Sequence, residues 1–338
     1  FFFQAEDGIR DHCVTGVQTC ALPILARKSC RCCGNHTFTR LSQLVEVDPF
    51  FARYGLQISS EETLVLPLLD WGLRRKVAKL PVRLAEKCNH FLDGFRSKQL
   101  LFSKCVKIPY GLCEHCEFLA PWYEVGDDQL QDYYSFYLKD EYKQARTSYQ
   151  PGFAQLGEIM GSPQEAELRR QQHETFLAPY LESLRHSRPD KIIRLLDYGG
   201  GEGLIIPRLP GVVGEVVDVE SGDAVSEDRI QNGFDLVQCL HVLEHVGHPH
   251  KTFQRLLAYC RKEGLIYLEV PIEHPGIASI NEGKLPICHE HINKLNLNAM
   301  HGLLQASGVD ILLLKEDTVD FLHLEGLTPV VRALVRKI

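Results

Sequence analysis

A glycine-rich turn between a short apolar run and a helix-like stretch constrains the fold of this chain more than any other feature. The turn, Asp197-Tyr198-Gly199-Gly200-Gly201-Glu202-Gly203, follows an apolar run at 192–196. Glycines have no Cβ, so the backbone can turn tightly and a ligand can approach it closely. In open α/β sheets, ligands bind at the carboxyl ends of the strands. Asp197, Gly199, Gly201 and Gly203 are therefore candidate residues of a nucleotide-type binding loop.

Short apolar runs separated by turns and helix-like stretches continue beyond this loop. They predict strands and helices in alternation, the strands at 192–196, 216–219, 234–239, 265–270 and 311–314, and the helices at 249–260 and 297–306. This alternation is typical of a parallel sheet covered by helices. We expect a doubly wound, Rossmann-like α/β domain.

An acidic residue ends the second predicted strand. Asp218 is placed there to accept hydrogen bonds from ribose hydroxyls, with Glu220 as the nearby alternative, although a solvated strand-end acid has the same pattern. The glycines follow the spacing Gly-x-Gly-x-Gly, and Leu204 stands where the dinucleotide fingerprint requires glycine or alanine. An NAD-dependent oxidoreductase is thus a disfavoured alternative.

A histidine motif follows the third predicted strand. His241-Val242-Leu243-Glu244-His245 matches the inverted zinc-protease motif, in which two histidines one helical turn apart bind zinc. Here the residues come directly after a buried-looking strand, so we expect them on the strand-to-helix loop and not within one continuous helix. The context therefore favours a ligand-binding role for His241 over a protease.

The order of these motifs resembles that of class I S-adenosylmethionine-dependent methyltransferases, particularly the branch that includes deoxysugar C-methyltransferases. The resemblance runs from about Ile192 to Leu314 and includes Phe234-Asp235-Leu236-Val237, the histidine motif and the run 265–271. It implies a seven-stranded methyltransferase sheet with an antiparallel edge, and a loop that cradles the methionine part of S-adenosylmethionine. It also implies a small-molecule acceptor such as a nucleotide-linked keto sugar.

The segment Cys288-His289-Glu290-His291 resembles the Tyr-His-Glu-His segment of the same branch. The implied chemistry is removal of a proton next to a ketone, followed by attack of the enolate on the sulfonium methyl. Histidine suits the first step because its ordinary pKa of about 6.5 lets it accept a proton near neutral pH. We expect His291 as the base, Glu290 as its orienting partner and His245 as a second candidate base. Cys288 stands in place of the tyrosine, so methyl transfer to oxygen or nitrogen stays open, as does a purely structural role for the histidines.

Two Cys-x-x-Cys pairs, here called the first and second knuckle, lie far apart in the N-terminal part of the chain. Four thiolates suit a tetrahedral zinc site, and the expected ligands are Cys30, Cys33, Cys113 and Cys116. Other residues offer spare ligands: Cys32, Cys88, Cys105 and His115. The deoxysugar branch carries an N-terminal zinc module of this kind. A redox pair is disfavoured because no thioredoxin-like pattern surrounds either knuckle.

The composition is that of a soluble globular protein, with 44% hydrophobic and 24% charged residues and no run near the roughly 18 apolar residues of a membrane span. A net charge of -7 argues against a generally basic nucleic-acid binder. We expect a cytoplasmic protein with neither membrane nor nucleic acid as a partner. A zinc-ribbon nucleic-acid-binding protein with a degenerate or RNA-modifying Rossmann-like domain is the alternative of a different class.

The chain divides into four predicted parts. Residues 1–24 match the translation of a common short-read sequencing adapter and are expected to be non-native. A zinc-binding module with an insertion is expected over 25–124, a helical connector over 125–189 and the methyltransferase domain over 190–338. Aromatic residues in the connector are expected to line an acceptor pocket or to form ordinary interdomain packing: Tyr133, Tyr134, Tyr137 and Tyr142.

Overall fold

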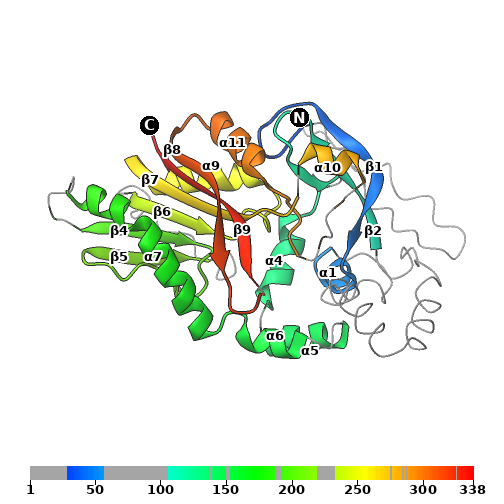
Figure 1. Cartoon of the computed structure of the whole chain (residues 1–338), viewed down its shortest axis with the longest axis horizontal. Coiled ribbons are helices and arrows are strands. Elements are labelled where there is room, and N and C mark those ends of the chain that lie inside the picture. The colour runs from blue at the N-terminus through cyan, green and yellow to red at the C-terminus, as the bar shows by residue number, and fades with distance from the viewer. Residues whose placement is uncertain are drawn as a thin grey trace, which may run out of the picture.

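The structure is a computed structural model. It describes residues 29–56, 106–122, 124–137, 139–149, 153–186, 190, 192–218, 233–274, 276–283, 285, 288, 290–324 and 326–338. Predictions about some residues lie outside this described part, namely those for 1–24, Cys88, Cys105, Glu220 and His289. The described residues form a small N-terminal sheet, a group of helices and a larger sheet with helices on both faces (Figure 1).

The small sheet is antiparallel, with strand order β1-β2-β3. Its strands are β1 (Phe38–Val47), β2 (Val106–Cys113) and β3 (Leu119–Pro121). Helix α1 (Pro49–Tyr54) follows β1 and begins after Asp48, whose side chain accepts hydrogen bonds from two backbone N–H groups of the first turn. Such a cap satisfies donors that a helix cannot pair internally.

Four helices lead from the small sheet to the large one. They are α4 (Asp127–Ser135), α5 (Asp140–Tyr149), α6 (Phe153–Ile159) and α7 (Pro163–His186). Leu177, Leu181 and Leu184 of α7 recur at helical spacing and pack against one face of the large sheet. In the described part of the chain, every helix is too short or too polar to cross a membrane.

The large sheet is mixed and has the strand order β5-β4-β6-β7-β9-β8. Its strands are β4 (Ile193–Tyr198), β5 (Val212–Val217), β6 (Phe234–Leu240), β7 (Cys260–Pro271), β8 (Asp310–Asp320) and β9 (Leu327–Arg336). Strands β5, β4, β6 and β7 are parallel, and β9 runs antiparallel to both of its neighbours. The expected α/β sheet with an antiparallel strand near one edge is thus confirmed. The described residues supply six of the seven expected strands, and 219–232 lie outside them.

Helices cover both faces of this sheet. Consecutive residues of a strand point to opposite faces, and in β7 Leu265 and Tyr267 pack with α7, while Ile266 and Leu268 share a core with α9 (Pro249–Tyr259) and α11 (Leu297–Ala306). A short helix α10 (Ile277–Asn281) precedes α11. The carboxyl ends of the parallel strands β4, β6 and β7 lie at the edge of the large sheet that faces the small N-terminal sheet (Figure 1).

Candidate active site

The glycine loop begins where β4 ends, at the carboxyl edge of the parallel strands. Gly199, Gly201 and Gly203 have φ angles of 75°, 55° and 71°, a left-handed backbone that strains residues with a Cβ. Gly200 needs its missing side chain for another reason, because a Cβ there would lie 2.0 Å from Oδ2 of Asp197. The loop therefore owes its shape to glycine and leaves room for a ligand to approach the backbone.

Asp197, the residue that precedes this loop by two positions, is almost completely buried. Among the described residues, its Oδ2 atom has no hydrogen-bond partner. Burial disfavours the charged form and raises the pKa of this carboxyl to about 6. A buried carboxylate oxygen beside a glycine loop fits a polar group of a bound ligand, which would supply the missing hydrogen bond.

Asp218 meets the glycine loop from the neighbouring strand. It follows β5, and its Oδ2 accepts a hydrogen bond of 2.7 Å from the backbone N–H of Gly201. Parallel pairing of β4 with β5 places the ends of the two strands side by side. The structure thus brings together five residues that the sequence predicted for a cofactor site: Asp197, Gly199, Gly201, Gly203 and Asp218.

His241 is the sixth residue that the sequence predicted for the cofactor site. It lies at the carboxyl end of β6 between two buried carboxylates. Its Nε2 lies 3.1 Å from Oε1 of Glu269 and its Nδ1 lies 3.5 Å from Oε1 of Glu244. Burial and the nearby Arg169 act to lower the pKa of His241, but the two carboxylates outweigh them and raise it. The backbone of His241 has a φ of 55°, which is uncommon for a residue other than glycine and recurs at functional sites.

The loop after β6 is not a helix, because residues 241–248 form turns and α9 begins only at Pro249. His241 and His245 are therefore not one turn apart on a helix, as the inverted zinc-protease motif requires. His241 contacts Glu244 and Glu269, whereas His245 contacts residues of other segments. This geometry rules out the protease interpretation.

His245 and His291 lie against each other, with ring centroids 4.5 Å apart and an angle of 80° between the rings. Nδ1 of His245 lies 2.5 Å from the hydroxyl of Tyr134, which α4 contributes. Nδ1 of His291 lies 2.5 Å from Oε1 of Glu273. Burial and the neighbouring His291 lower the pKa of His245 to about 4. Burial opposes the charged form of His291 as well, but Glu273 reverses its effect and raises the pKa.

Glu273 is a site residue that the sequence analysis missed. It lies two residues beyond the end of β7, and its second carboxylate oxygen lies 3.0 Å from Nζ of the fully buried Lys294. The positive charges of His291 and Lys294 outweigh burial and lower the pKa of Glu273. Its position just after a parallel strand of the sheet was the signal that could have identified it.

Glu290, the expected partner of His291, has a different set of contacts. Its Oε1 accepts hydrogen bonds from the hydroxyls of Tyr133 and Tyr142 and forms an ion pair with Arg146. Arg146 is buried and requires a negative charge beside it. Glu273, and not Glu290, is thus the carboxylate that contacts the ring of His291, while Glu290 neutralises a buried arginine.

The predicted aromatic cluster is mostly core. Tyr133 and Tyr142 are fully buried and pack edge to face with Phe50, next to the small sheet. Tyr134 differs because its hydroxyl reaches His245 and also donates to the backbone oxygen of Glu290 at 3.2 Å. Tyr134 thus contacts a candidate catalytic histidine.

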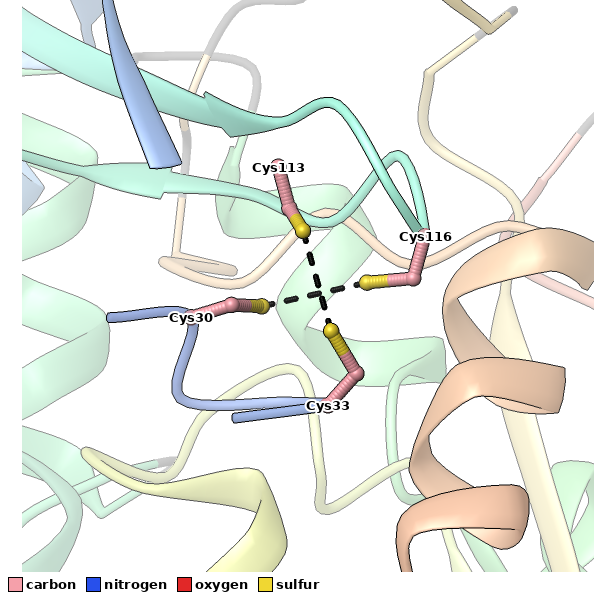
Figure 2. Close-up of side chains that lie close together, drawn as sticks. All are labelled: Cys30, Cys33, Cys113 and Cys116. Atoms are coloured by element: carbon pink, nitrogen blue, oxygen red, sulfur yellow. Dashed lines mark hydrogen bonds between the residues drawn. The ribbon is translucent and has the colours of Figure 1, made fainter. Parts of the chain in front are cut away.

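The four cysteines of the two knuckles converge from separate segments (Figure 2). Sγ of Cys30 lies 3.8 Å from that of Cys116, and Sγ of Cys33 lies 3.7 Å from that of Cys113. A zinc tetrahedron with bonds of about 2.3 Å has sulfur atoms about 3.8 Å apart. All four cysteines are free thiols, so the chemistry and the spacing of the donors both fit zinc.

Two of the spare ligands do not belong to this cluster. Cys32 is buried but its thiol donates to the backbone oxygen of Ala299 at 3.2 Å. His115 lies within the second knuckle and is exposed. The described part of the chain therefore favours the predicted set of four thiolates.

The first knuckle is tied to the loop that carries the candidate catalytic histidine. The guanidinium of Arg31 donates to the backbone oxygen of Gly247. The backbone N–H of His250 in turn donates to the backbone oxygen of Arg31 at 3.1 Å. From the other side, the amide of Asn293 donates to the backbone oxygen of Val246 at 2.6 Å. The cysteine module thus helps to fix the loop between β6 and α9.

Comparison with known proteins agrees with this geometry. Residues 166–314 match the family model described as a methyltransferase domain. The match includes the glycine loop and both histidine segments and covers less than half of the chain, and the four clustered cysteines lie outside it. This part of the chain accordingly has a methyltransferase fold. No curated protein sequence matches the chain.

Several solved structures have a similar arrangement, and methyltransferases are among them. A SAM-dependent methyltransferase from Methanosarcina mazei is 9% identical, with a TM-score of 0.33 over 44% of this chain and 93% of the other. Magnesium protoporphyrin IX methyltransferase from Synechocystis PCC 6803, with bound SAH, is 15% identical, with a TM-score of 0.32 over 49% and 84%. The plantazolicin methyltransferase BpumL, in complex with SAH, is 15% identical, with a TM-score of 0.38 over 62% and 94%.

Proposed function

We propose that this protein transfers a methyl group from S-adenosylmethionine to a small-molecule acceptor. The observation that carries the proposal is the hydrogen bond between Asp218 and the backbone of Gly201, which joins the glycine loop to the acid of the next strand. Asp197, Gly199, Gly201 and Gly203 would hold the methionine part of the cofactor, and Asp218 its ribose hydroxyls. His241 would lie beside the same site. When bound, S-adenosylmethionine supplies an activated methyl group.

The paired histidines support an acceptor that must lose a proton. His291 would accept that proton at Nε2, because Glu273 occupies its Nδ1 and fixes the orientation of the ring. His245, whose ring centroid lies 4.5 Å from that of His291, would be a second acceptor for the proton. Glu290 would act only through its structural contacts. A nucleotide-linked keto sugar, methylated at the carbon next to its ketone, is our preferred acceptor.

Position 288 bears on which atom is methylated. Burial raises the pKa of the Cys288 thiol to about 11, and this thiol donates to the backbone oxygen of His291 at 3.1 Å. The thiol is thus engaged with the protein backbone. The hydroxyl of Tyr134 is engaged as well, with Nδ1 of His245 and the backbone oxygen of Glu290, so these two side chains supply no donor for the oxygen of a keto acceptor. Transfer to oxygen or nitrogen needs no such donor and is the second candidate reaction.

The zinc ion of the cysteine module would act through structure. Four buried or half-buried thiolates leave no open position on a tetrahedral ion. We therefore assign it the task of holding the knuckle, and with it Arg31 and the loop that bears His245.

Cofactor binding is tested by titrating S-adenosylmethionine into the zinc-loaded full chain in a calorimeter. We expect micromolar affinity, a loss of more than about tenfold in Asp218→Ala, and no change in Asp310→Ala, an exposed acid at the start of β8. A folded sample without affinity for S-adenosylmethionine would refute the proposal. Binding of an RNA that weakens steeply with salt would then favour the nucleic-acid alternative.

The reaction type is tested by proton exchange. If His291 removes a proton next to a ketone, a nucleotide-linked keto sugar incubated with the enzyme in heavy water will acquire deuterium at that carbon, and His291→Gln will abolish the exchange. Methyl transfer without exchange in any acceptor screened would point to an oxygen or nitrogen atom.

A further inference from the structure

A second group of metal-type ligands lies away from the four cysteines. Glu244, His245 and His291 each place one ligand atom within 4.8 Å of those of the other two. The first two residues come from the loop after β6, and His291 comes from the segment that precedes α11. The fold therefore assembles this group from segments that are remote in sequence.

The carboxylate of Glu244 is the independent sign that something binds here. The residue has no exposed surface, and neither carboxylate oxygen has a hydrogen-bond partner among the described residues. Its charged neighbour is His241, whose Nδ1 lies 3.5 Å from Oε1. His241 offsets part of this charge, but a buried carboxylate normally also accepts hydrogen bonds, and here neither oxygen does so within the described part of the chain.

The two histidines are oriented as metal-binding histidines usually are. In such sites the ring nitrogen that does not bind the ion is held by a carboxylate, a carbonyl group or a similar polar group. Glu273 holds Nδ1 of His291, and the hydroxyl of Tyr134 holds Nδ1 of His245, each at 2.5 Å. Nε2 of each ring is the atom that remains for an ion.

We propose that Glu244, His245 and His291 bind a divalent transition-metal ion. Two imidazoles and one carboxylate are a donor set for iron(II), manganese, cobalt, nickel or zinc, with coordination positions left open. Bonds of about 2.1 Å would hold the ligand atoms about 3.0 to 3.5 Å from one another. The open positions are available for oxygen atoms of an acceptor.

This site stands apart from the proposed methyl transfer, because an ion can bind here whether or not S-adenosylmethionine binds. The two assignments meet at Nε2 of His291, which cannot accept a proton while it binds an ion. With the ion in place, its positive charge would lie beside an oxygen atom of the acceptor and would lower the pKa of the acceptor's hydroxyl or enol group. The ion would then replace His291 as the source of activation.

The site is tested with cobalt(II) added to full-chain protein that already holds one zinc ion at the cysteines. Metal analysis after desalting and the visible spectrum are the readouts. We expect one further ion per chain, with the weak bands of nitrogen and oxygen ligands and without the intense charge-transfer bands of a thiolate. Glu244→Gln and His291→Gln should each reduce the affinity at least tenfold. His301→Ala, an exposed histidine of α11, should bind as the wild type does.

Retention of one zinc ion and an unchanged circular dichroism spectrum show that each variant is folded. Wild-type protein that takes up no ion beyond the first zinc would overturn the proposal. An affinity in Glu244→Gln equal to that of the wild type would overturn it as well. Calorimetry with S-adenosylmethionine is a separate measurement, so failure of the proposed methyl transfer would not be mistaken for failure of this site.

Discussion

Cys116 and Gly302 lie so close together that a Cβ on Gly302 would be 2.6 Å from the Cβ of Cys116. Cys116 belongs to the second knuckle, and Gly302 lies in the middle of α11 on the methyltransferase sheet. The same added atom would lie 3.3 Å from the Cβ of Cys33 in the first knuckle. Glycine at this position thus allows the cysteine module and the methyltransferase domain to pack directly on each other.

Gly302→Ala should destabilise the protein although the position is helical. Alanine in place of glycine inside a helix normally stabilises by about 1 kcal/mol. Here the new methyl group would press on Cys116, so we expect a lower melting temperature and faster transfer of zinc to a chelator. Asn298→Ala, an exposed substitution in the same helix, should not change the rate of zinc loss. A melting temperature above that of the wild type would show that helix α11 and Cys116 are not closely packed at position 302.

Loss of one thiolate should release zinc and loosen the loop after β6. Cys30→Ser leaves three thiolates, and we expect the zinc affinity to fall more than about 100-fold and the affinity for S-adenosylmethionine to fall with it. Cys32→Ala removes a neighbouring buried thiol that is not in the cluster, and it should keep one zinc per chain. Equal zinc content in the two variants, measured by metal analysis, would contradict the assignment of the ligands.

Gly200→Ala should impair cofactor binding through a steric effect. The φ angle at Gly200 is not in the left-handed region, so alanine is not strained there by its backbone. Its Cβ would instead lie 2.0 Å from Oδ2 of Asp197 and force that side chain to move. We expect calorimetry to show at least a tenfold loss of affinity for S-adenosylmethionine. Gly126→Ala, where the nearest atom is 3.4 Å away, is the control and should bind normally.

The buried Asp197 should make the stability of the protein depend on pH. Burial raises its pKa from 3.8 to about 6, so the unfolded chain gives up this proton more readily than the folded one. Ionisation therefore destabilises the folded state, by little below about pH 4 and by about 3 kcal/mol above about pH 6. Asp197→Asn should be more stable than the wild type at pH 7.5, by up to that amount, and the difference should fall to about half at pH 5.

Urea unfolding at the two pH values measures this difference. Asp310→Asn, an exposed substitution, should give no such trend. A stability difference that does not vary with pH would show that Asp197 keeps its charge over the whole range.

The sequence predicted β4, β6 and β7 because these parallel strands are short apolar runs bounded by glycine or proline. It placed the second strand at 216–219, whereas β5 spans Val212–Val217, because Gly214 and Glu215 break the apolar pattern there. It failed to predict β9, in which Arg332 interrupts the apolar run from Val330 to Val335 and the exposed Pro329 precedes that run. Arg332 is tolerated inside the sheet because Glu269 and Asp317 of the two neighbouring strands accept its hydrogen bonds. Pairing between strands that are remote in sequence cannot be seen in a local pattern.

The candidate site also contains some residues that the sequence could predict and others that it could not. The loop glycines and Asp218 could be predicted, because each lies at the end of a strand and such ends gather at one edge of a parallel sheet. The partner of His291 could not, because two acids compete for that role. Glu290 is adjacent in sequence but is held by Arg146, whereas Glu273 comes 18 residues earlier. Which acid faces the histidine depends on where the buried cations lie.

Glu290 should therefore affect stability more than chemistry. Glu290→Gln keeps a side chain that can bond to the tyrosines but leaves Arg146 buried without its counter-charge. We expect urea unfolding to show a loss of about 3 to 5 kcal/mol, the usual effect of breaking a buried ion pair, while Glu316→Gln on the exposed side of β8 changes little. Combining Arg146→Met with Glu290→Gln should recover most of the loss, because no unpaired charge then remains and the amide oxygen still accepts from the hydroxyls of Tyr133 and Tyr142. A Glu290→Gln variant with wild-type stability and no methyl transfer would instead support the catalytic role that the sequence motif predicted.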